Sequence, residues 1–371
     1  MSTALVKPVG DRCNLACSHC FYRSDVERTK GVMEERVLAA TIHRFLDEGN
    51  SPTVFAWQGG EPTLAGPEFY RTALGWQRRF ARRGQRVVNT FQTNGVLIDE
   101  EWADFLAESH FLVGLSIDGP PDMHDALRQS AEGSGSHVLA TRAWRLLRER
   151  GCEVNLLCVV HRGNCKHAAR VYRHMTEAIG AGYLQFIPFI ETDRQQPSER
   201  APGVGGYGRF LVELFEIWAA ESRPVSVKLF DDIVLFLAGK PMRDCMHRNE
   251  CDSHLVVECD GSVYPCDFFA GRKHYLGNVS ANSVSEMRNL PAARTFRQRK
   301  EKRRPKACLE CRHLDICQSG CCRFWRRING EGWSQGLCPD LLFFFDHCRR
   351  AMERMAASIR ERWQQLGATQ T

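Results

Sequence analysis

The stretch 13-CNLACSHCFY-22 places three cysteines in a C-x3-C-x2-C array close to the start of the chain. Cysteine thiolates ligate zinc and iron–sulfur clusters, and closed sites of both kinds normally take four ligands. Three thiolates satisfy three irons of a [4Fe–4S] cube and leave the fourth iron open for an external ligand. A zinc site completed by His19 is the alternative, although a ligand directly next to Cys20 makes tetrahedral geometry awkward.

The rest of the composition favours metal ligation in a reducing compartment. The chain has 371 residues, of which 43% are hydrophobic and 25% charged, as in globular proteins. No apolar run approaches the ~20 residues of a membrane span, and the N-terminus lacks the apolar region of a secretory signal. We therefore expect a cytoplasmic protein without a membrane partner, in which 17 cysteines serve metal sites and not disulfides. A net charge of +6 is modest, so we expect no nucleic-acid partner.

Up to about Lys228, short β-branched apolar runs alternate with amphipathic helical patterns. This alternation predicts a parallel sheet with right-handed crossovers. Without a nucleotide-type glycine fingerprint, it favours an α/β fold of the partial (β/α)6 TIM-like barrel type, with a doubly wound sheet as the alternative. The expected strands are 4–8, 53–57, 87–92, 111–117, 153–160 and 183–189. The expected helices include 33–49, 100–109, 138–151 and 207–222.

Unusual polar and glycine-rich segments follow the first four expected strands. The cysteine array follows the first strand, and the next three are followed by 58-QGGEP-62, 92-QTNG-95 and 116-SIDG-119. In barrels of this type, the loops at the carboxyl ends of the strands carry the chemistry. Any one of these loops is explained by turn formation alone, but four at one rim indicate a shared ligand.

The composition changes after Lys228, because eleven cysteines lie between Cys245 and Cys348. We expect a barrel over 1–228, a cysteine-rich domain over 229–350 held by metal sites, and a C-terminal helix or tail over 351–371. The basic run 297-RQRKEKRRPK-306 is interpreted as a solvated helix face.

The array together with 59-GGEP-62 resembles the radical S-adenosylmethionine (SAM) enzymes. The resemblance implies that Cys13, Cys17 and Cys20 hold a [4Fe–4S] cluster whose open iron binds the amino and carboxylate groups of SAM. In that superfamily the GGEP backbone holds the amino group of the cofactor. Other positions match contacts to its ribose or carboxylate. The implied cofactor-binding residues are Gly59, Gly60, Glu61, Ser116, Asp118 and Arg128.

Eight C-terminal cysteines resemble a SPASM domain with two auxiliary [4Fe–4S] clusters, which makes three clusters in all. The resemblance implies a first set of Cys245, Cys251, Cys266 and Cys321. It implies a second set of Cys308, Cys311, Cys317 and Cys338. Cys322 or Cys348 could replace an assigned ligand, and a zinc ribbon over 308–317 is the alternative to a cluster. We assign no function to the remaining cysteines, which suit buried positions: Cys152, Cys158, Cys165 and Cys259.

The sequence is most similar to the anaerobic sulfatase-maturating enzymes, which oxidise a cysteine or serine of a sulfatase to Cα-formylglycine. The matching segments are 20-CFY-22, 57-WQGGEPTLAG-66, 91-FQTNGVLIDEEW-102, 112-LVGLSIDGP-120, 155-NLLCVV-160, 185-QFIP-188 and 263-VYPCDF-268. The resemblance implies that Asp267 is the base, and a carboxylate beside a negative cluster should hold its proton more tightly, as suits that role. Asp231 and Asp232 are the competing acids, for which salt bridges or helix capping are the simpler interpretation.

The resemblance also implies substrate contacts and partners. Tyr22 and Gln58 would touch the substrate, although ordinary packing explains Tyr22 equally well. We expect a sulfatase-like protein or peptide substrate and a reductant such as flavodoxin or ferredoxin. The alternative activity is crosslinking or epimerisation of a ribosomally made peptide. The first strand begins almost at residue one, which disfavours a leader-recognition domain. A non-catalytic iron–sulfur or zinc scaffold is the alternative from another class.

Overall fold

The protein is described by a computed structural model covering residues 2–22, 31–189, 198–222, 224–328 and 332–368. The chain forms two compact units, which we describe separately. The first unit contains residues 1–157 and 251–298, and the second contains residues 158–250 and 299–371.

The first unit is built on a sheet whose strand order is β10-β9-β8-β1-β2-β3-β4-β5. Strands β1 to β5 and β8 are parallel, and β9 and β10 are antiparallel additions. Strand β5 begins in this unit and runs on into the second. The bounds are β1 Ser2–Val6, β2 Thr53–Trp57, β3 Val87–Thr93, β4 Leu112–Ser116, β5 Glu153–Val160, β8 Leu255–Val257, β9 Ser262–Tyr264 and β10 Gly277–Asn278.

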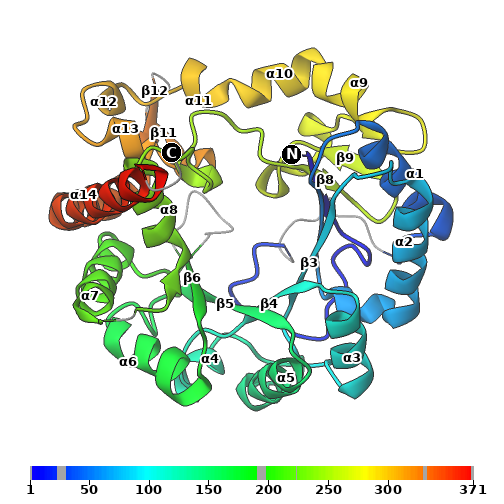
Figure 1. Cartoon of the computed structure of the whole chain (residues 1–371), viewed down its shortest axis with the longest axis horizontal. Coiled ribbons are helices and arrows are strands. Elements are labelled where there is room, and N and C mark those ends of the chain that lie inside the picture. Colours follow the sequence, from blue (N-terminus) through cyan, green and yellow to red (C-terminus); the bar gives the residue numbers. More distant parts are fainter. Residues whose placement is uncertain (1, 23–30, 190–197, 223, 329–331, 369–371) are drawn as a thin grey trace. The chain divides into compact units, whose positions relative to one another are not determined.

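Amphipathic helices connect the parallel strands of the first unit and lie outside β3 and β4 in Figure 1. Helix α1 buries Val37, Leu38 and Ile42, which recur on one face at helical spacing. The ring of Tyr70 from α2 packs 5.4 Å from Trp57 of β2, which anchors the helix to the sheet. The bounds are α1 Glu35–Asp47, η1 Pro62–Ala65, α2 Pro67–Phe80, α3 Glu100–Glu108, α4 Pro121–His124, α5 His137–Glu149, η4 Asp267–Phe269, η5 Arg272–His274, α9 Val284–Asn289 and α10 Pro291–Arg297.

The second unit combines the end of the βα succession with the C-terminal cysteines. Its strands β6 and β7 are parallel, and β11 and β12 form a separate hairpin. Strand bounds are β6 Tyr183–Pro188, β7 Ser226–Val227, β11 Trp325–Ile328 and β12 Gly332–Gln335. Helix bounds are α6 Ala168–Arg173, η2 His174–Ile179, α7 Gly206–Ala220, α8 Lys228–Leu237, η3 Cys245–His247, α11 Arg299–Lys302, α12 Lys306–Leu309, α13 Leu314–Cys317, η6 Cys322–Phe324 and α14 Cys338–Ala368.

The long helix α14 fastens the C-terminal part of this unit to α7 and α8. Its first turn contains Asp340, a buried residue whose carboxylate accepts hydrogen bonds from the backbone N–H groups of Gly205 and Gly208 at 3.2 and 2.8 Å. A Cβ at position 208 would lie 2.4 Å from the Asp340 carbonyl oxygen, so only glycine allows this approach. Further along, Phe344 stacks on Phe230 of α8 at 5.9 Å.

The predicted strands and helices all appear, with small shifts at their ends. Two features differ from the expected organisation. Helix α14 begins at Cys338, before the expected tail at 351. Strand β8, expected within a separate cysteine-rich domain, pairs with β1 in the first unit. The domain boundaries at 228 and 350 stay predictions.

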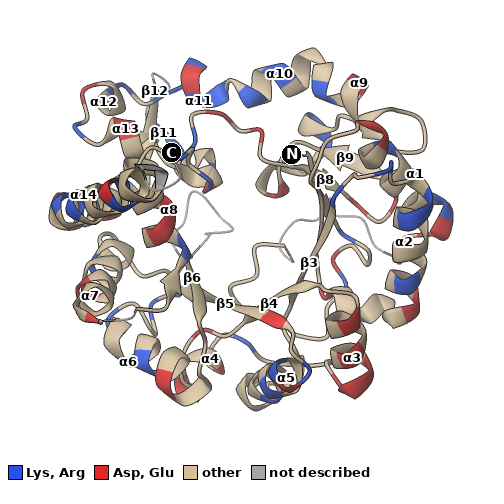
Figure 2. Cartoon of the chain, in the orientation of Figure 1, with Lys and Arg blue, Asp and Glu red and all other residues tan. Residues whose placement is uncertain are grey.

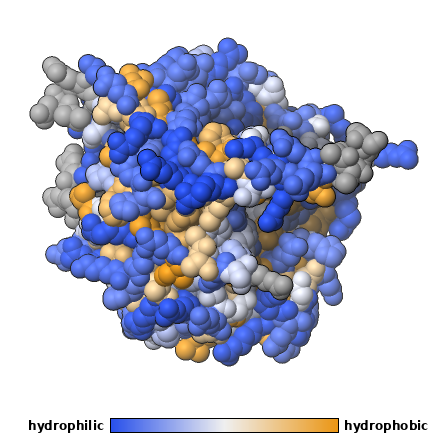
Figure 3. Space-filling view, turned by 60° about the vertical axis from the view of Figure 1, so that its left-hand side comes forward, coloured by the Kyte–Doolittle hydropathy of each residue, from blue (hydrophilic) through white to orange (hydrophobic). Residues whose placement is uncertain are grey.

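Charged residues are concentrated on helices such as α1, α3 and α5 (Figure 2). On the face seen in Figure 3, hydrophilic residues dominate and hydrophobic residues form small groups. Among the described residues, no helix combines the length and apolar character that crossing a membrane would require.

Candidate active site

The three-cysteine array forms a loop after β1 in which the thiols influence one another. The backbone N–H of Leu15 donates to Cys13 Sγ at 3.4 Å. Burial raises the pKa of the Cys13 thiol to about 12, and the charges of Glu61, Cys17 and Cys20 add to this effect. A thiolate in this position therefore needs a cation to compensate it, and iron supplies that charge. The donor set fits a cluster held by three cysteines.

The loop also has space beside it. A cavity of about 490 Å³ is lined by residues 11–16 and by Ala131. Zn–S bonds of about 2.3 Å bring the ligands of one zinc ion close together. Among the residues that the structure describes, no three His, Cys, Asp or Glu side chains are arranged to hold a single metal ion.

The GGEP segment lies directly against the backbone that precedes the cysteines. The N–H of Gly60 donates to Gly10 O and that of Glu61 to Arg12 O, each at 2.8 Å. A Cβ at position 60 would lie 1.9 Å from Arg12 O. Gly59 has φ +137°, a conformation that L side chains rarely adopt. The two glycines therefore allow the second loop to contact the cluster loop, and their carbonyl oxygens are acceptors suited to an amino group.

Glu61 ties three loops together through its buried carboxylate. Its Oε1 accepts from the hydroxyls of Thr63 and Thr93, both at 2.7 Å, and its Oε2 accepts from the backbone N–H of Asn94 at 2.8 Å. Burial raises the pKa of this carboxyl, and the hydrogen bonds oppose that shift. Asn94 in turn donates to Asn14 Oδ1 at 2.8 Å. The Glu61 side chain thus links the GGEP segment, whose backbone was predicted to hold the cofactor, to the neighbouring loops.

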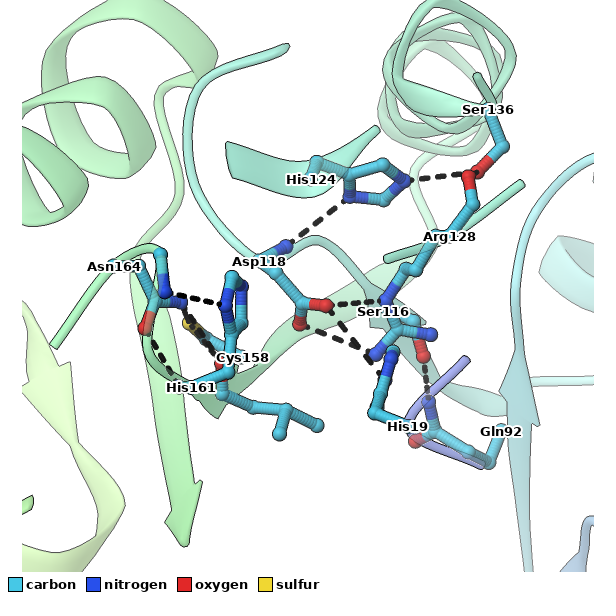
Figure 4. Close-up of polar contacts among 12 residues, drawn as sticks. His19, Gln92, Ser116, Asp118, His124, Arg128, Ser136, Cys158, His161 and Asn164 are labelled. Atoms are coloured by element: carbon cyan, nitrogen blue, oxygen red, sulfur yellow. Dashed lines mark hydrogen bonds and ion pairs between the residues drawn. The ribbon is translucent and has the colours of Figure 1, made fainter. Parts of the chain in front are cut away.

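Asp118 and Arg128 form a buried ion pair beside the cluster loop (Figure 4). Arg128 Nε lies 2.6 Å from Asp118 Oδ2, and Nη2 lies 3.2 Å from Oδ1. His19 Nε2 lies 3.9 Å from the same carboxylate. Burial alone would raise the pKa of Asp118, but the charges of Arg128 and His19 outweigh burial and hold it well below its usual range. Asp118 is therefore ionised and paired.

A second set of contacts orders the segment between these partners. His124 Nδ1 accepts from the Asp118 N–H at 3.2 Å, and its Nε2 lies 3.0 Å from Ser136 Oγ, which donates to the Arg128 carbonyl at 2.8 Å. Burial lowers the pKa of His124 to about 3, so the ring is neutral. Since Nδ1 of His124 accepts and Ser136 Oγ uses its own proton on the Arg128 carbonyl, these hydrogen bonds assign the proton of the His124 ring to Nε2.

The ordered segment in turn holds the cysteine loop. The N–H of Ala16 donates to Gln129 O at 2.7 Å, and that of Ser18 donates to Leu127 O at 3.0 Å. Arg128 lies between these two acceptors. The ion pair with Asp118 holds Arg128 in place and therefore supports the cluster loop through these two backbone hydrogen bonds.

Ser116 and Gln58 lie at the ends of β4 and β2. Ser116 Oγ accepts a hydrogen bond from Gln92 Nε2 at 3.1 Å (Figure 4). The Gln58 backbone N–H donates to Val6 O at 3.0 Å, which places this residue beside the end of β1. Both residues are thus at the carboxyl ends of parallel strands, as expected.

The predicted base, Asp267, is held by a lysine that the sequence analysis did not identify. Lys7 Nζ lies 3.0 Å from Asp267 Oδ1 and 3.1 Å from Oδ2, and both residues are buried. The ammonium favours the ionised carboxylate, which opposes the expected effect of a negative cluster. The same Nζ lies 4.6 Å from the ring centroid of Tyr22, whose hydroxyl donates to Glu258 Oε2 at 2.8 Å. Lys7 thus contacts both Asp267 and Tyr22.

The second predicted cysteine set gathers within the second unit. Burial raises the pKa of Cys317 to about 12, with further contributions from Cys308, Cys311 and Cys338. Helix α14 holds the intervening segment, because His313 Nε2 lies 2.6 Å from Asp346 Oδ1 and Arg349 pairs with Asp315 at 2.8 Å. Four cysteine sulfurs close enough to influence one another fit the cationic core of an iron–sulfur cluster.

Members of the first predicted set belong to different units, with Cys251 and Cys266 in the first and Cys245 and Cys321 in the second. Its ligation stays a prediction. Cys322 and Cys348 are both buried, as are the four thiols to which no function was assigned. Asp232 pairs with Lys228 at 2.6 Å and with Arg243 at 2.7 Å, in agreement with the salt-bridge interpretation.

Three contributing residues were missed by sequence reasoning: Lys7, Asn94 and Glu258. The signal for Asn94 was its place within 92-QTNG-95. A lysine at the end of an apolar strand was the signal for Lys7, because a charge there needs a buried partner. Nothing in the sequence pointed to Glu258, which approaches Tyr22 because β8 pairs with β1.

Comparisons with known proteins agree with this arrangement. Residues 8–173 match the Radical SAM superfamily, and residues 245–312 match SPASM, an iron–sulfur cluster-binding domain. A cysteine-type anaerobic sulfatase-maturating enzyme of Clostridium perfringens is 37% identical over 86% of this chain and 88% of its own. A serine-type enzyme of Bacteroides thetaiotaomicron is 32% identical over 96% of this chain and 91% of its own.

Solved structures are similar over nearly the whole length. Native anSMEcpe with bound AdoMet superimposes with a TM-score of 0.91 at 32% identity, covering 97% of this chain and 100% of that one. The same enzyme with AdoMet and the Cp18Cys peptide gives 0.90, with coverage of 96% and 99%. These findings confirm the predicted α/β fold with a partial (β/α) barrel and a SPASM domain. They also confirm the predicted cofactors, iron–sulfur clusters and SAM. The chain therefore belongs to the anaerobic sulfatase-maturating enzymes, a group of radical SAM enzymes with a SPASM domain.

Proposed function

We propose that this chain oxidises a cysteine or serine residue of a sulfatase to Cα-formylglycine. The observation that carries the proposal is the position of Asp267. It directly follows Cys266, is paired with Lys7 at 3.0 Å, and lies in the same unit as the three-cysteine array. A buried carboxylate in this place suits the removal of a proton from a substrate thiol or hydroxyl.

The chemistry balances with one hydrogen atom, one proton and one electron removed from the substrate. SAM bound at a cluster held by Cys13, Cys17 and Cys20 would, on reductive cleavage, supply a 5′-deoxyadenosyl radical able to remove a hydrogen atom from the substrate Cβ. Loss of the thiol proton and one electron then converts cysteine to a thioaldehyde, and water replaces the sulfur to give the aldehyde and hydrogen sulfide. Serine gives the aldehyde directly. Asp267 is the proposed acceptor of the proton.

The chain's own residues prepare Asp267 for this task. The Lys7 ammonium, 3.0 Å from Asp267 Oδ1, holds the carboxylate in place directly after Cys266. Lys7 also reaches the ring of Tyr22 at 4.6 Å, and Phe21 contacts Phe268 at 4.9 Å between ring centroids. The cluster loop and the segment around the base are therefore held together. We propose that the substrate binds beside these two segments, with Tyr22 and Gln58 as contacts.

The cofactor sites follow from the same proposal. Cys13, Cys17 and Cys20 hold the SAM-binding cluster, and the two sets of four C-terminal cysteines hold the auxiliary clusters. The Gly59–Gly60–Glu61 segment receives the amino group through its carbonyl oxygens. Ser116 and Arg128 contribute to the carboxylate or ribose site, and Asp118 orients Arg128. The auxiliary clusters are the proposed acceptors of the electron.

The remaining assignments concern the cellular setting. We propose a sulfatase-like protein or peptide as the substrate and a flavodoxin or ferredoxin as the source of electrons. We place the protein in the cytoplasm, because its 17 cysteines suit a reducing compartment.

Replacement of the base tests the proposal. Asp267→Asn is expected to retain cleavage of SAM to 5′-deoxyadenosine and to lose formylglycine, because asparagine accepts no proton in this role. Asp260→Asn is the matched control, since Asp260 is an exposed carboxylate in the turn between β8 and β9, seven positions before Asp267. Both products are quantified after anaerobic reconstitution. A wild-type yield of formylglycine from Asp267→Asn would reject the proposed base.

A further inference from the structure

The basic run 297–306 contains a lysine that is not on the surface. Lys300 is 1% exposed. Its Nζ donates to the carbonyl oxygens of Met246 and Arg248, each at 2.7 Å, and lies 3.4 Å from the carbonyl oxygen of Cys245. All of these residues belong to the second unit. An ammonium has three N–H donors, so the three carbonyls occupy its whole donor set.

The charge of Lys300 remains after these contacts. Carbonyl dipoles replace the lost water but carry no net charge, and burying an ammonium is costly unless such acceptors surround it. The carboxylate next to Cys245 in sequence is Asp244, and the charge of Lys300 acts on it. Asp244 already lies 2.8 Å from His247 Nδ1 and 3.8 Å from Lys228 Nζ. Lys228, which also pairs with Asp232 at 2.6 Å, is thus an ion-pair partner of Asp244, and the ammonium of Lys300 is bound by backbone carbonyls.

The hydrogen bonds of Lys300 fix the conformation of the turn that begins at Cys245, in addition to filling space beside it. Cys245 begins the short helix η3, and its carbonyl, with those of Met246 and Arg248, faces one point. Convergent carbonyls repel one another unless a cation lies between them. An apolar side chain of similar length would fill the same volume but would leave these carbonyls without donors.

We infer that Lys300 is a positioning residue for the auxiliary iron–sulfur cluster to which Cys245 belongs. It fixes the turn that carries Cys245 and holds a positive charge beside this ligand. The inference rests on the proposed ligand role of Cys245. A reduced cluster carries one more negative charge than the oxidised cluster, so a nearby fixed cation favours reduction. A raised potential suits a cluster that accepts an electron from substrate.

Charge removal at position 300 tests the inference. Lys300→Met is compared with Lys302→Met, which removes an exposed lysine of the same run. After anaerobic reconstitution, iron and sulfide are counted, and the midpoint potentials of the auxiliary clusters are measured by electron paramagnetic resonance during redox titration. We expect Lys300→Met to shift one auxiliary potential to a more negative value or to lose that cluster. Lys302→Met should change neither. Wild-type iron content and potentials in Lys300→Met would overturn the inference.

Two more variants separate this inference from the proposal beneath it. Cys245→Ala should lose one cluster, and full iron content in this variant would reject Cys245 as a ligand. Loss of that cluster in Cys245→Ala, with unchanged potentials in Lys300→Met, would reject only the role of Lys300. Lys300→Arg retains the charge, and it tests the role of that charge if Lys300→Met does not fold. A wild-type potential in Lys300→Arg supports the charge role, and a shift to a more negative potential contradicts it.

Discussion

Removal of the Arg128 side chain should loosen the loop that carries the SAM-binding cluster. Asp118 is fully buried, and the Arg128 side chain is 10% exposed. Breaking such a pair by removing one partner costs about 3–5 kcal/mol, because the other charge stays buried and uncompensated. Since 1.4 kcal/mol is a factor of ten, the cost corresponds to a factor of roughly 100 to 4,000 in a local opening equilibrium.

The opening equilibrium can be read at two amides of the cluster loop. Ala16 and Ser18 donate backbone hydrogen bonds to the residues on either side of Arg128. Amide hydrogen exchange, followed by mass spectrometry on the reconstituted enzyme, measures their protection. In Arg128→Met, protection of both amides should fall by the factor given above, and deuterium uptake of strands β2 and β3 should not change.

A double variant and a surface control make the test specific. Asp118→Asn combined with Arg128→Met removes both charges, so it should restore part of the protection, with a coupling of about 1–3 kcal/mol. Arg150→Met removes an exposed pair with Asp104, whose side chains are 37% and 50% exposed, and should leave the loop unchanged. Protection within a factor of about three of wild type in Arg128→Met would refute the reasoning.

Two further changes address the neighbouring contacts. Gly60→Ala places a Cβ 1.9 Å from Arg12 O, so it should lower the free energy of unfolding by about 1–3 kcal/mol or more. The control, Gly75→Ala, has open space around the new Cβ and should be neutral or stabilising. Equal melting temperatures of the two variants would contradict this. Lys7→Met should change the rate of SAM cleavage by no more than about threefold and should lower formylglycine formation by about 10–100-fold, because the Asp267 carboxylate loses its position. An unchanged ratio of formylglycine to 5′-deoxyadenosine would show that Lys7 is not needed.

Local patterns predicted most of the elements around the site. Alternation of apolar strands and amphipathic helices placed β1 to β6, and the glycine-rich loops after the strands marked the rim. The same reasoning explains Gly60, whose role is a backbone approach that leaves no room for a side chain. Cysteine spacing alone, in contrast, did not divide the C-terminal ligands into sets. That division came from the resemblance to a family.

Long-range pairing explains what the sequence did not reveal. Strand β8 is three residues long, Leu255–Val257, and its pairing with β1 brings Glu258 and Asp267 toward Lys7. Such a short strand has no periodicity to detect, and its partner lies about 250 positions earlier in the chain. The interpretation of the basic run as a solvated face missed Lys300 for the same reason. Its acceptors are backbone carbonyls, which no side-chain pattern predicts.

The most direct test of the account is the product formed from a sulfatase-like peptide. Anaerobic incubation of the reconstituted enzyme with SAM, a reductant and short peptides carrying C-x-P-x-R or S-x-P-x-R is followed by mass spectrometry and by labelling of aldehydes with a hydrazide. The account predicts an aldehyde at the target residue, with sulfur replaced by oxygen in the cysteine peptide. Loss of two hydrogens without reactivity toward the hydrazide, as a crosslink would give, would contradict it.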